Sequence, residues 1–217
     1  VVAGCLALTG ISPAQDWPQW RGPNRDARAT GFVAPKEWPK ELTKRWSVPV
    51  GEGVATPALV GDRLYVFSRE GGNEVVRCLE GATGKEVWQD RYETGGAPGP
   101  AARFSGPRSS PTVADGKVVT LGVRGILTCY DTAGKQPWRK KPTSNTIPKF
   151  AVASSPVIAD GLCIVQVGGE GSGGVVAYDL ANGNEKWKWA EEGSAYASPV
   201  LLAGGKTVVA ETDKSVV

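Results

Sequence analysis

The chain repeats one pattern along most of its length, and this periodicity limits the folds open to it. Four segments share a small residue, a proline, a short apolar run, a glycine-containing turn and a second β-rich run. They read ATPALVGDRLYVFS, SSPTVADGKVVTLG, SSPVIADGLCIVQV and ASPVLLAGGKTVVA. Their prolines are 54, 45 and 43 residues apart, at Pro57, Pro111, Pro156 and Pro199. Repeats of this length indicate a solenoid, a propeller or a similar array of small units.

Each unit also has a second half that ends in tryptophan. VVRCLEGATGKEVW, ILTCYDTAGKQPW and VVAYDLANGNEKW end at equivalent positions, and KRWSVPV at residues 44–50 matches the last strand of an earlier unit. Asp-Gly and Gly-Asp pairs between apolar runs are strong hairpin signals. Two hairpins in a unit of about 45 residues are typical of a four-stranded propeller blade. We therefore predict an all-β chain whose blade cores span about 55–88, 109–138, 154–187 and 197–217.

One blade cannot bury both of its faces, so neighbouring blades must pack against each other. Tryptophan offers a large flat surface for such packing, and its N–H needs an acceptor when it is buried. We predict that four equivalent tryptophans dock one blade onto the next, namely Trp46, Trp88, Trp138 and Trp187. Cys78 and Cys129 lie at matching points of the repeat, where we expect buried thiols without a disulfide.

The pattern Ser-Ser-Pro-x-Val-x-x-Gly, followed by Tyr-Asp-x-x-x-Gly-x-x-x-Trp, resembles the PQQ-like repeat of quinoprotein dehydrogenases and BamB-type outer-membrane assembly lipoproteins. The resemblance covers about residues 44–217, although the turn after Asp131 is one residue shorter than the turn after Asp179. The opening DWPQWRGPNRD and the later GPRSSP are similar to a secreted bacterial subgroup of unassigned function. This resemblance implies a β-propeller ring of seven or eight four-stranded antiparallel blades, of which the chain would form an incomplete arc of about four.

The N-terminal region differs in character from the repeats. Residues 1–14 are mostly small and apolar, and Ser12-Pro13-Ala14 fits a signal-peptidase site, so we expect a truncated signal peptide and an exported, periplasmic or extracellular protein. A rival interpretation places a lipid anchor on Cys5. Residues 15–43 form a proline-rich segment that we expect to pack onto the propeller as an extended strap, with Trp17, Trp20 and Trp38 as its contacts or as an aromatic patch for a partner. No run is long enough to predict a transmembrane span.

The absence of histidine from the sequence narrows the chemistry available to these residues. It excludes a Ser-His or Cys-His nucleophilic pair and a histidine-built zinc site within this chain. Asp62, Asp115 and Asp160 recur in one tight turn, so turn formation explains them better than catalysis. The glycine-rich stretch at residues 168–174 lacks the lysine and helix start of a phosphate loop. The net charge of +3 is interspersed, and we predict no nucleic-acid binding.

Residues that differ between repeats just before the inner strand are the candidate binding residues. Arg103, Arg108 and Tyr196 lie where a propeller opens onto its central channel, and arginine there could bind a carboxylate or another anion. The alternative is that the arginines anchor the loop and the tyrosine packs. We predict no catalytic residue and no metal site. The leading functional hypothesis is a non-catalytic scaffold that binds an envelope protein or an extracellular ligand.

The alternative function is a PQQ-dependent quinoprotein dehydrogenase whose site lies partly in blades beyond this sequence. The family resemblance would then imply PQQ, a Ca²⁺ ion held by carboxylate and amide oxygens, and an aspartate base. Many such enzymes carry adjacent cysteines, which are absent from this sequence. If the protein is not a quinoprotein dehydrogenase, we expect it to bind no cofactor.

Overall fold

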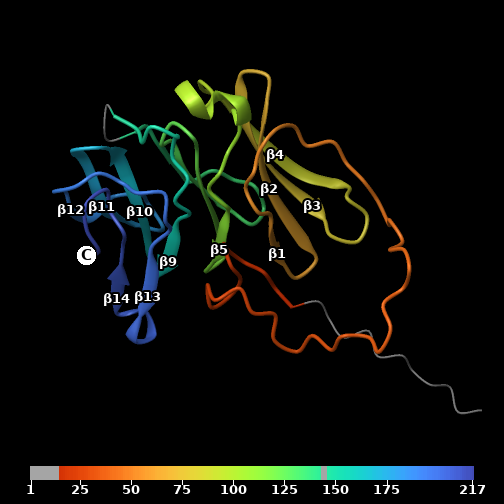
Figure 1. The fold of residues 1–217 in the computed structure, drawn as a ribbon. Coiled ribbons are helices and arrows are strands. Elements are labelled where there is room, and N and C mark those ends of the chain that lie inside the picture. Colours follow the sequence, from red (N-terminus) through yellow and green to blue (C-terminus); the bar gives the residue numbers. More distant parts are fainter. Residues whose placement is uncertain (1–14, 143–145) are drawn as a thin grey trace, which may run out of the picture.

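The computed structural model describes residues 15–142 and 146–217, and its regular structure is almost entirely β (Figure 1). The sheets stand side by side as an arc, from the orange and yellow strands to the blue ones. All strand pairs are antiparallel, and each complete sheet has four strands in sequence order. The predicted arc of four-stranded blades is therefore confirmed. The expected signal peptide and Cys5 lie outside the described residues.

Three blades are complete, and a fourth contributes one hairpin. The first consists of β1 (Ala58–Val60), β2 (Arg63–Glu70), β3 (Asn73–Glu80) and β4 (Glu86–Glu93). The second consists of β5 (Thr112–Ala114), β6 (Lys117–Leu121), β7 (Leu127–Asp131) and β8 (Trp138–Lys140). The third consists of β9 (Val157–Ala159), β10 (Leu162–Gly169), β11 (Ser172–Asp179) and β12 (Glu185–Trp189). The hairpin of β13 (Val200–Leu202) and β14 (Thr207–Val209) follows, and the two 3-10 helices are η1 (Gly99–Phe104) and η2 (Ala203–Gly205).

The hydrophobic core lies between the blades. One cluster joins Phe67 and Val76 of the first blade to Val118 and Tyr130 of the second. A second cluster joins the second blade to the third, and a third joins the third blade to the β13–β14 hairpin. The first strands of the blades also contact each other, β1 with β5 and β5 with β9. These contacts identify β1, β5 and β9 as the strands nearest the axis of the arc.

The repeated aspartates act in turns, as predicted. Asp115 and Asp160 have φ values of 51° and 48°, and each is followed by a glycine with positive φ. Two successive residues in this region form the hairpin turn that matches the twist of the flanking strands. The carboxylate of Asp131 accepts the N–H of Ala133 at 3.0 Å, and that of Asp179 accepts the N–H of Ala181 at 3.0 Å.

Three of the four equivalent tryptophans make the same contact with the next blade. The indole Nε1–H donates to a main-chain carbonyl at 3.0 Å in each case, from Trp46 to Gly81, from Trp88 to Thr132 and from Trp138 to Leu180. A glycine with positive φ packs on each indole, and a Cβ atom added at Gly84, Gly134 or Gly183 would lie 2.6–2.8 Å from the ring. Trp187 is 39% exposed and has no such bond within the described residues. Residues 44–50 likewise form no strand, because no neighbouring strand in the described ranges pairs with them.

A second inter-blade contact involves the serines of the Ser-Pro motif. The N–H of Thr56 donates to the hydroxyl of Ser110, that of Ser110 to Ser155, and that of Ser155 to Ser198, at 3.2, 3.0 and 2.9 Å. Each bond links one blade to the next near the inner strands. The Ser-Pro motif therefore stabilises the arc, which explains why a small hydroxyl residue precedes the proline.

The first part of the proline-rich segment lies along the inner strands. Trp17 and Leu59 exchange two backbone hydrogen bonds, at 2.7 and 3.0 Å, so the segment adds a bridge to the edge of β1. Pro18 accepts the N–H of Val113 in the second blade, and Arg25 donates to the carbonyl of Pro156 just before the third. The segment thus contacts three blades in turn. Trp38, farther along, is 63% exposed and stacks on Phe32.

Candidate functional site

The loops that connect one blade to the next lie together at one end of the arc. Their described residues are 94–111, 141–142 with 146–156, and 190–199, between the outer strand of a blade and the inner strand of its successor. We call this end the loop face. It carries Arg103, Arg108 and Tyr196, the three residues predicted to bind a ligand.

The structure gives the two arginines different surroundings. Arg108 donates to the carbonyls of Ala101 and Gly106, at 3.0 and 3.3 Å, and so holds η1 in place. Its guanidinium is partly withdrawn from water, and this burial lowers the pKa of Arg108 from its usual value. Arg103 instead lies over the ring of the neighbouring Phe104, with its Cζ 5.5 Å from the ring centroid. Arg108 is therefore engaged by its own loop, whereas Arg103 lies at the surface.

Each of the three connecting loops presents one exposed aromatic side chain. Phe104, Phe150 and Tyr196 are 56%, 46% and 45% exposed. The rings of Phe150 and Tyr196 meet edge to face, with centroids 5.9 Å apart. Lys149 lies over Phe150 as Arg103 lies over Phe104. We call Phe104, Phe150 and Tyr196 the aromatic row. Sequence reasoning selected Tyr196 and missed both phenylalanines, because they lie outside the repeated pattern.

A pocket of about 390 Å³ opens beside Tyr196 on the loop face. The hydroxyl of Tyr196 accepts the backbone N–H of Phe150 at 3.1 Å, which fixes the position of the phenol ring. The remaining lining includes Lys149 from the loop before the third blade, Glu170 from the β10–β11 turn, and Asp213 and Lys214 from the chain after β14. Both charge signs and an aromatic ring therefore meet in one recess.

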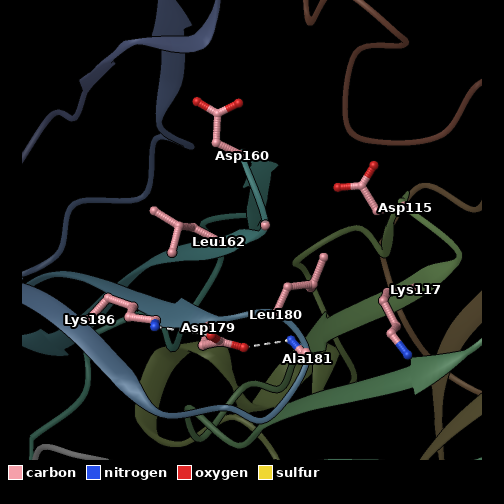
Figure 2. A pocket seen from close by; sticks show the side chains of 9 residues that line it. Asp115, Lys117, Asp160, Leu162, Asp179, Leu180, Ala181 and Lys186 are labelled. Carbon is pink, nitrogen blue, oxygen red and sulfur yellow. Dashed lines mark hydrogen bonds and ion pairs between the residues drawn. The ribbon is translucent and has the colours of Figure 1, made fainter.

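A larger pocket of about 600 Å³ lies between the turns of the second and third blades at the opposite end of the arc. Figure 2 shows Asp115 and Lys117 together on one side of it, with Asp160 apart from them and Lys186 across from Lys117. Lys186 pairs with Asp179 at 3.1 Å, and Asp179 also holds its own turn. The aspartates are thus turn residues spread around the pocket. In the part of the chain that the structure describes, no group of three acidic or cysteine side chains could hold a metal ion.

A polar cluster that sequence reasoning missed joins the first two blades. The Tyr130 hydroxyl donates to Asp90 at 2.9 Å, and Arg139 contacts both groups. The guanidinium of Arg139 also lies over the ring of Tyr92, 4.3 Å from its centroid. Burial raises the pKa of the Tyr130 hydroxyl and keeps it neutral. The cluster fills an inter-blade interface, so its role is structural.

Glu74 is a fully buried carboxyl group in the same interface. It accepts the Tyr92 hydroxyl at 2.6 Å and the N–H of Val123 at 2.8 Å. Burial raises the pKa of Glu74, and these two hydrogen bonds oppose part of that effect. A Cβ atom at Gly122 would lie 2.0 Å from the carboxylate, so glycine is needed there to make room. This carboxyl group links β3 to the loop after β6.

The predicted buried thiols are confirmed. Three cysteines are buried and free of disulfides, namely Cys78, Cys129 and Cys163. Within the described ranges, no helix is long and apolar enough to cross a membrane.

Curated relatives of the chain are outer membrane protein assembly factors BamB. The protein from Burkholderia pseudomallei is 26% identical over 69% of this chain and 34% of its own length. The protein from Xanthomonas campestris pv. campestris is 32% identical over 43% of this chain and 24% of its own length. The chain therefore spans about a third or less of the curated relatives that it matches.

Solved structures support the same fold. BamB from Moraxella catarrhalis matches 79% of this chain and 47% of its own chain, with 20% identity and a TM-score of 0.55. Quinohemoprotein alcohol dehydrogenase from Comamonas testosteroni matches 87% of this chain and 29% of its own, with 23% identity and a TM-score of 0.58. The PQQ_2 family model, described as outer membrane protein assembly factor BamB, matches residues 20–195. Since that match covers most of the sequence, the chain belongs to the BamB-type family of PQQ-like β-propeller repeat proteins.

Proposed function

We propose that this chain is part of an exported, non-catalytic β-propeller scaffold that holds an envelope protein on its loop face. The observation that carries the proposal is the aromatic row, because three successive loops each expose one ring at the same end of the arc. Aromatic side chains and arginine are enriched in the cores of protein interfaces. Arg103 lies beside Phe104 of the aromatic row. Arg108 holds the loop that carries Phe104, through its hydrogen bond to Ala101. In this proposal Arg103 contacts the partner and Arg108 positions the loop.

Two further observations support a binding role. The relatives that match the sequence are named as assembly factors of outer membrane proteins. The sequence also contains no histidine, the commonest general base near neutral pH. In this proposal residues 1–14 belong to an export signal and residues 15–43 to a strap. The likeness to an alcohol dehydrogenase concerns the fold, which hosts many functions.

Site-specific photocrosslinking of the whole protein in its host envelope tests the proposal. A photoreactive aromatic residue would replace Phe104 or Phe150 on the loop face, and Val87 as a matched control. Val87 is 45% exposed but lies on β4, away from the connecting loops. We expect crosslinked protein partners from both phenylalanine positions and few from Val87.

Equal crosslinking at all three positions would contradict the proposed face. Absence of crosslinks at both phenylalanines would also contradict it. If the whole protein bound PQQ and reduced a dye with an alcohol or a sugar, the dehydrogenase alternative would replace the scaffold.

A further inference from the structure

The motif DWPQWRGPNRD forms a compact turn against the inner strands. We call residues 16–27 the cap. Backbone hydrogen bonds within the cap turn it back on itself. Toward the blades, the N–H groups of Leu59 and Val113 donate to the carbonyls of Trp17 and Pro18, at 3.0 and 2.8 Å. The cap is therefore a small unit that rests on the axis side of the first two blades.

Arg25 is buried between the cap and the third blade, with only 8% of its surface exposed. Its Nη1 donates to the side chain of Gln19 at 3.0 Å and to the carbonyl of Pro156 at 3.2 Å. Its Nε and Nη2 atoms have no hydrogen-bond partner in the described chain. No ion pair between described residues includes Arg25. Burial lowers the pKa of Arg25 to about 10.

A buried cation without a counter-charge destabilises the structure that holds it. The charges of the cap balance in number, since Asp16 and Asp26 stand against Arg21 and Arg25. Their positions differ, however, because both aspartates are exposed to water and Arg25 is not. Asp16 accepts the N–H of Gly61, and neither aspartate pairs with Arg25 within the described ranges. The buried guanidinium therefore lacks a nearby anion.

The two free nitrogens lie on one edge of the guanidinium. The N–H groups of Nε and Nη2 are parallel, and this edge binds both oxygens of a carboxylate at once. The indole of Trp20 lies beside it, with its ring centroid 5.7 Å from the Cζ of Arg25. The site thus combines a free bidentate donor with an apolar wall, which suits a carboxylate attached to a short hydrocarbon chain.

The backbone of the cap is strained around this arginine. Arg21, Arg25 and Ala27 have φ values of 63°, 57° and 61°, a region that residues other than glycine rarely adopt. Such strain persists where the surroundings hold it, and it is concentrated at binding and switch segments. Because Nε and Nη2 are shielded from water, a ligand reaches them when the cap lifts from the blades.

We propose that the cap binds a small carboxylate ligand through Nε and Nη2 of Arg25, beside the ring of Trp20. The bound carboxylate supplies the counter-charge that the closed cap lacks. Binding therefore stabilises the closed cap relative to the lifted one. This site lies at the axis of the arc, apart from the loop face, and adds a small-molecule site to the proposed scaffold.

Hydrogen–deuterium exchange of the whole protein tests the inference, with sodium propionate as the probe. The amides of Leu59 and Val113 report on the cap, because their acceptors are cap carbonyls. At a propionate concentration about ten times its Kd, both amides should exchange about tenfold more slowly. Propionamide, which has a similar shape without the charge, and sodium chloride at the same ionic strength should leave their exchange unchanged.

Arg25→Lys keeps the positive charge and removes the bidentate edge, so it should abolish the effect of propionate. Arg28→Lys is the matched control, since Arg28 is exposed just beyond the cap, and should keep the effect. The inference is overturned if propionate slows neither amide, if propionamide or chloride slows them equally, or if the slowing persists in Arg25→Lys. Should the cap of Arg25→Lys stay lifted without any ligand, the comparison of propionate with propionamide in the unmodified protein decides.

Discussion

Replacing Trp138 by phenylalanine should destabilise the chain by about 2–3 kcal/mol. Trp138 is only 7% exposed, and its Nε1–H donates to Leu180 of the next blade. Loss of that hydrogen bond, which leaves a buried carbonyl poorly paired, costs about 1–2 kcal/mol. The smaller ring also loses part of the contact with Gly183, and the space left behind adds about 1 kcal/mol.

Trp38→Phe is the matched control for this prediction. Trp38 is 63% exposed, and its indole N–H has no partner among the described residues, so the same substitution should change stability by less than about 0.5 kcal/mol. Urea unfolding followed by circular dichroism measures both variants against the unmodified chain. An equal loss in the two variants, or a loss below about 1 kcal/mol for Trp138→Phe, would refute the inter-blade role.

Three further predictions concern the turns, the buried acid and the thiols. Gly183→Ala should destabilise the folded chain by about 1 kcal/mol more than Gly161→Ala. Both glycines have positive φ, but only at Gly183 would the new Cβ lie 2.8 Å from Trp138. Equal urea midpoints for the two variants would contradict this. The pKa of Glu74 is raised by burial from 4.5, so the native state keeps a proton that the unfolded chain releases, and this contribution to stability is lost as pH rises through the raised pKa. Glu74→Gln should therefore gain stability relative to the unmodified chain as the pH rises above 4.5, the ordinary pKa of glutamate. A difference that does not vary with pH in urea titrations would argue against it. Burial raises the pKa of Cys129 to about 11 and raises those of the other buried thiols. In a Cys5→Ser background, a thiol reagent should thus leave the native protein unmodified and label three cysteines in urea, whereas rapid labelling of the native protein would show that a thiol is accessible.

The blades could be predicted from the sequence because each depends on local signals. Asp115-Gly116 and Asp160-Gly161 specify tight turns by their own backbone preferences, and alternating apolar runs specify the strands between them. The pairing within a blade therefore follows from residues close together in the chain. The tryptophan contacts could also be anticipated, since their spacing copies that of the blades.

The contacts between different blades were harder to predict. The acceptor of the Ser110 N–H is a hydroxyl 45 residues away, and Glu74 meets Val123 across an interface that no local pattern marks. The aromatic row escaped prediction for a related reason. Phe104 and Phe150 lie in loops of unequal length, so comparison of the repeats does not align them, and their common location appears only when the loops are seen at one end of the arc.

The serine contacts have a consequence for how such arcs can change in evolution. Each unit brings an amide donor for the unit after it and a hydroxyl acceptor for the unit before it, so the junction is head-to-tail and the same at every step. A duplicated blade inserted in register would find both halves of its junction already present in its neighbours. As far as these serine bonds are concerned, whole units can be added or removed without a compensating substitution.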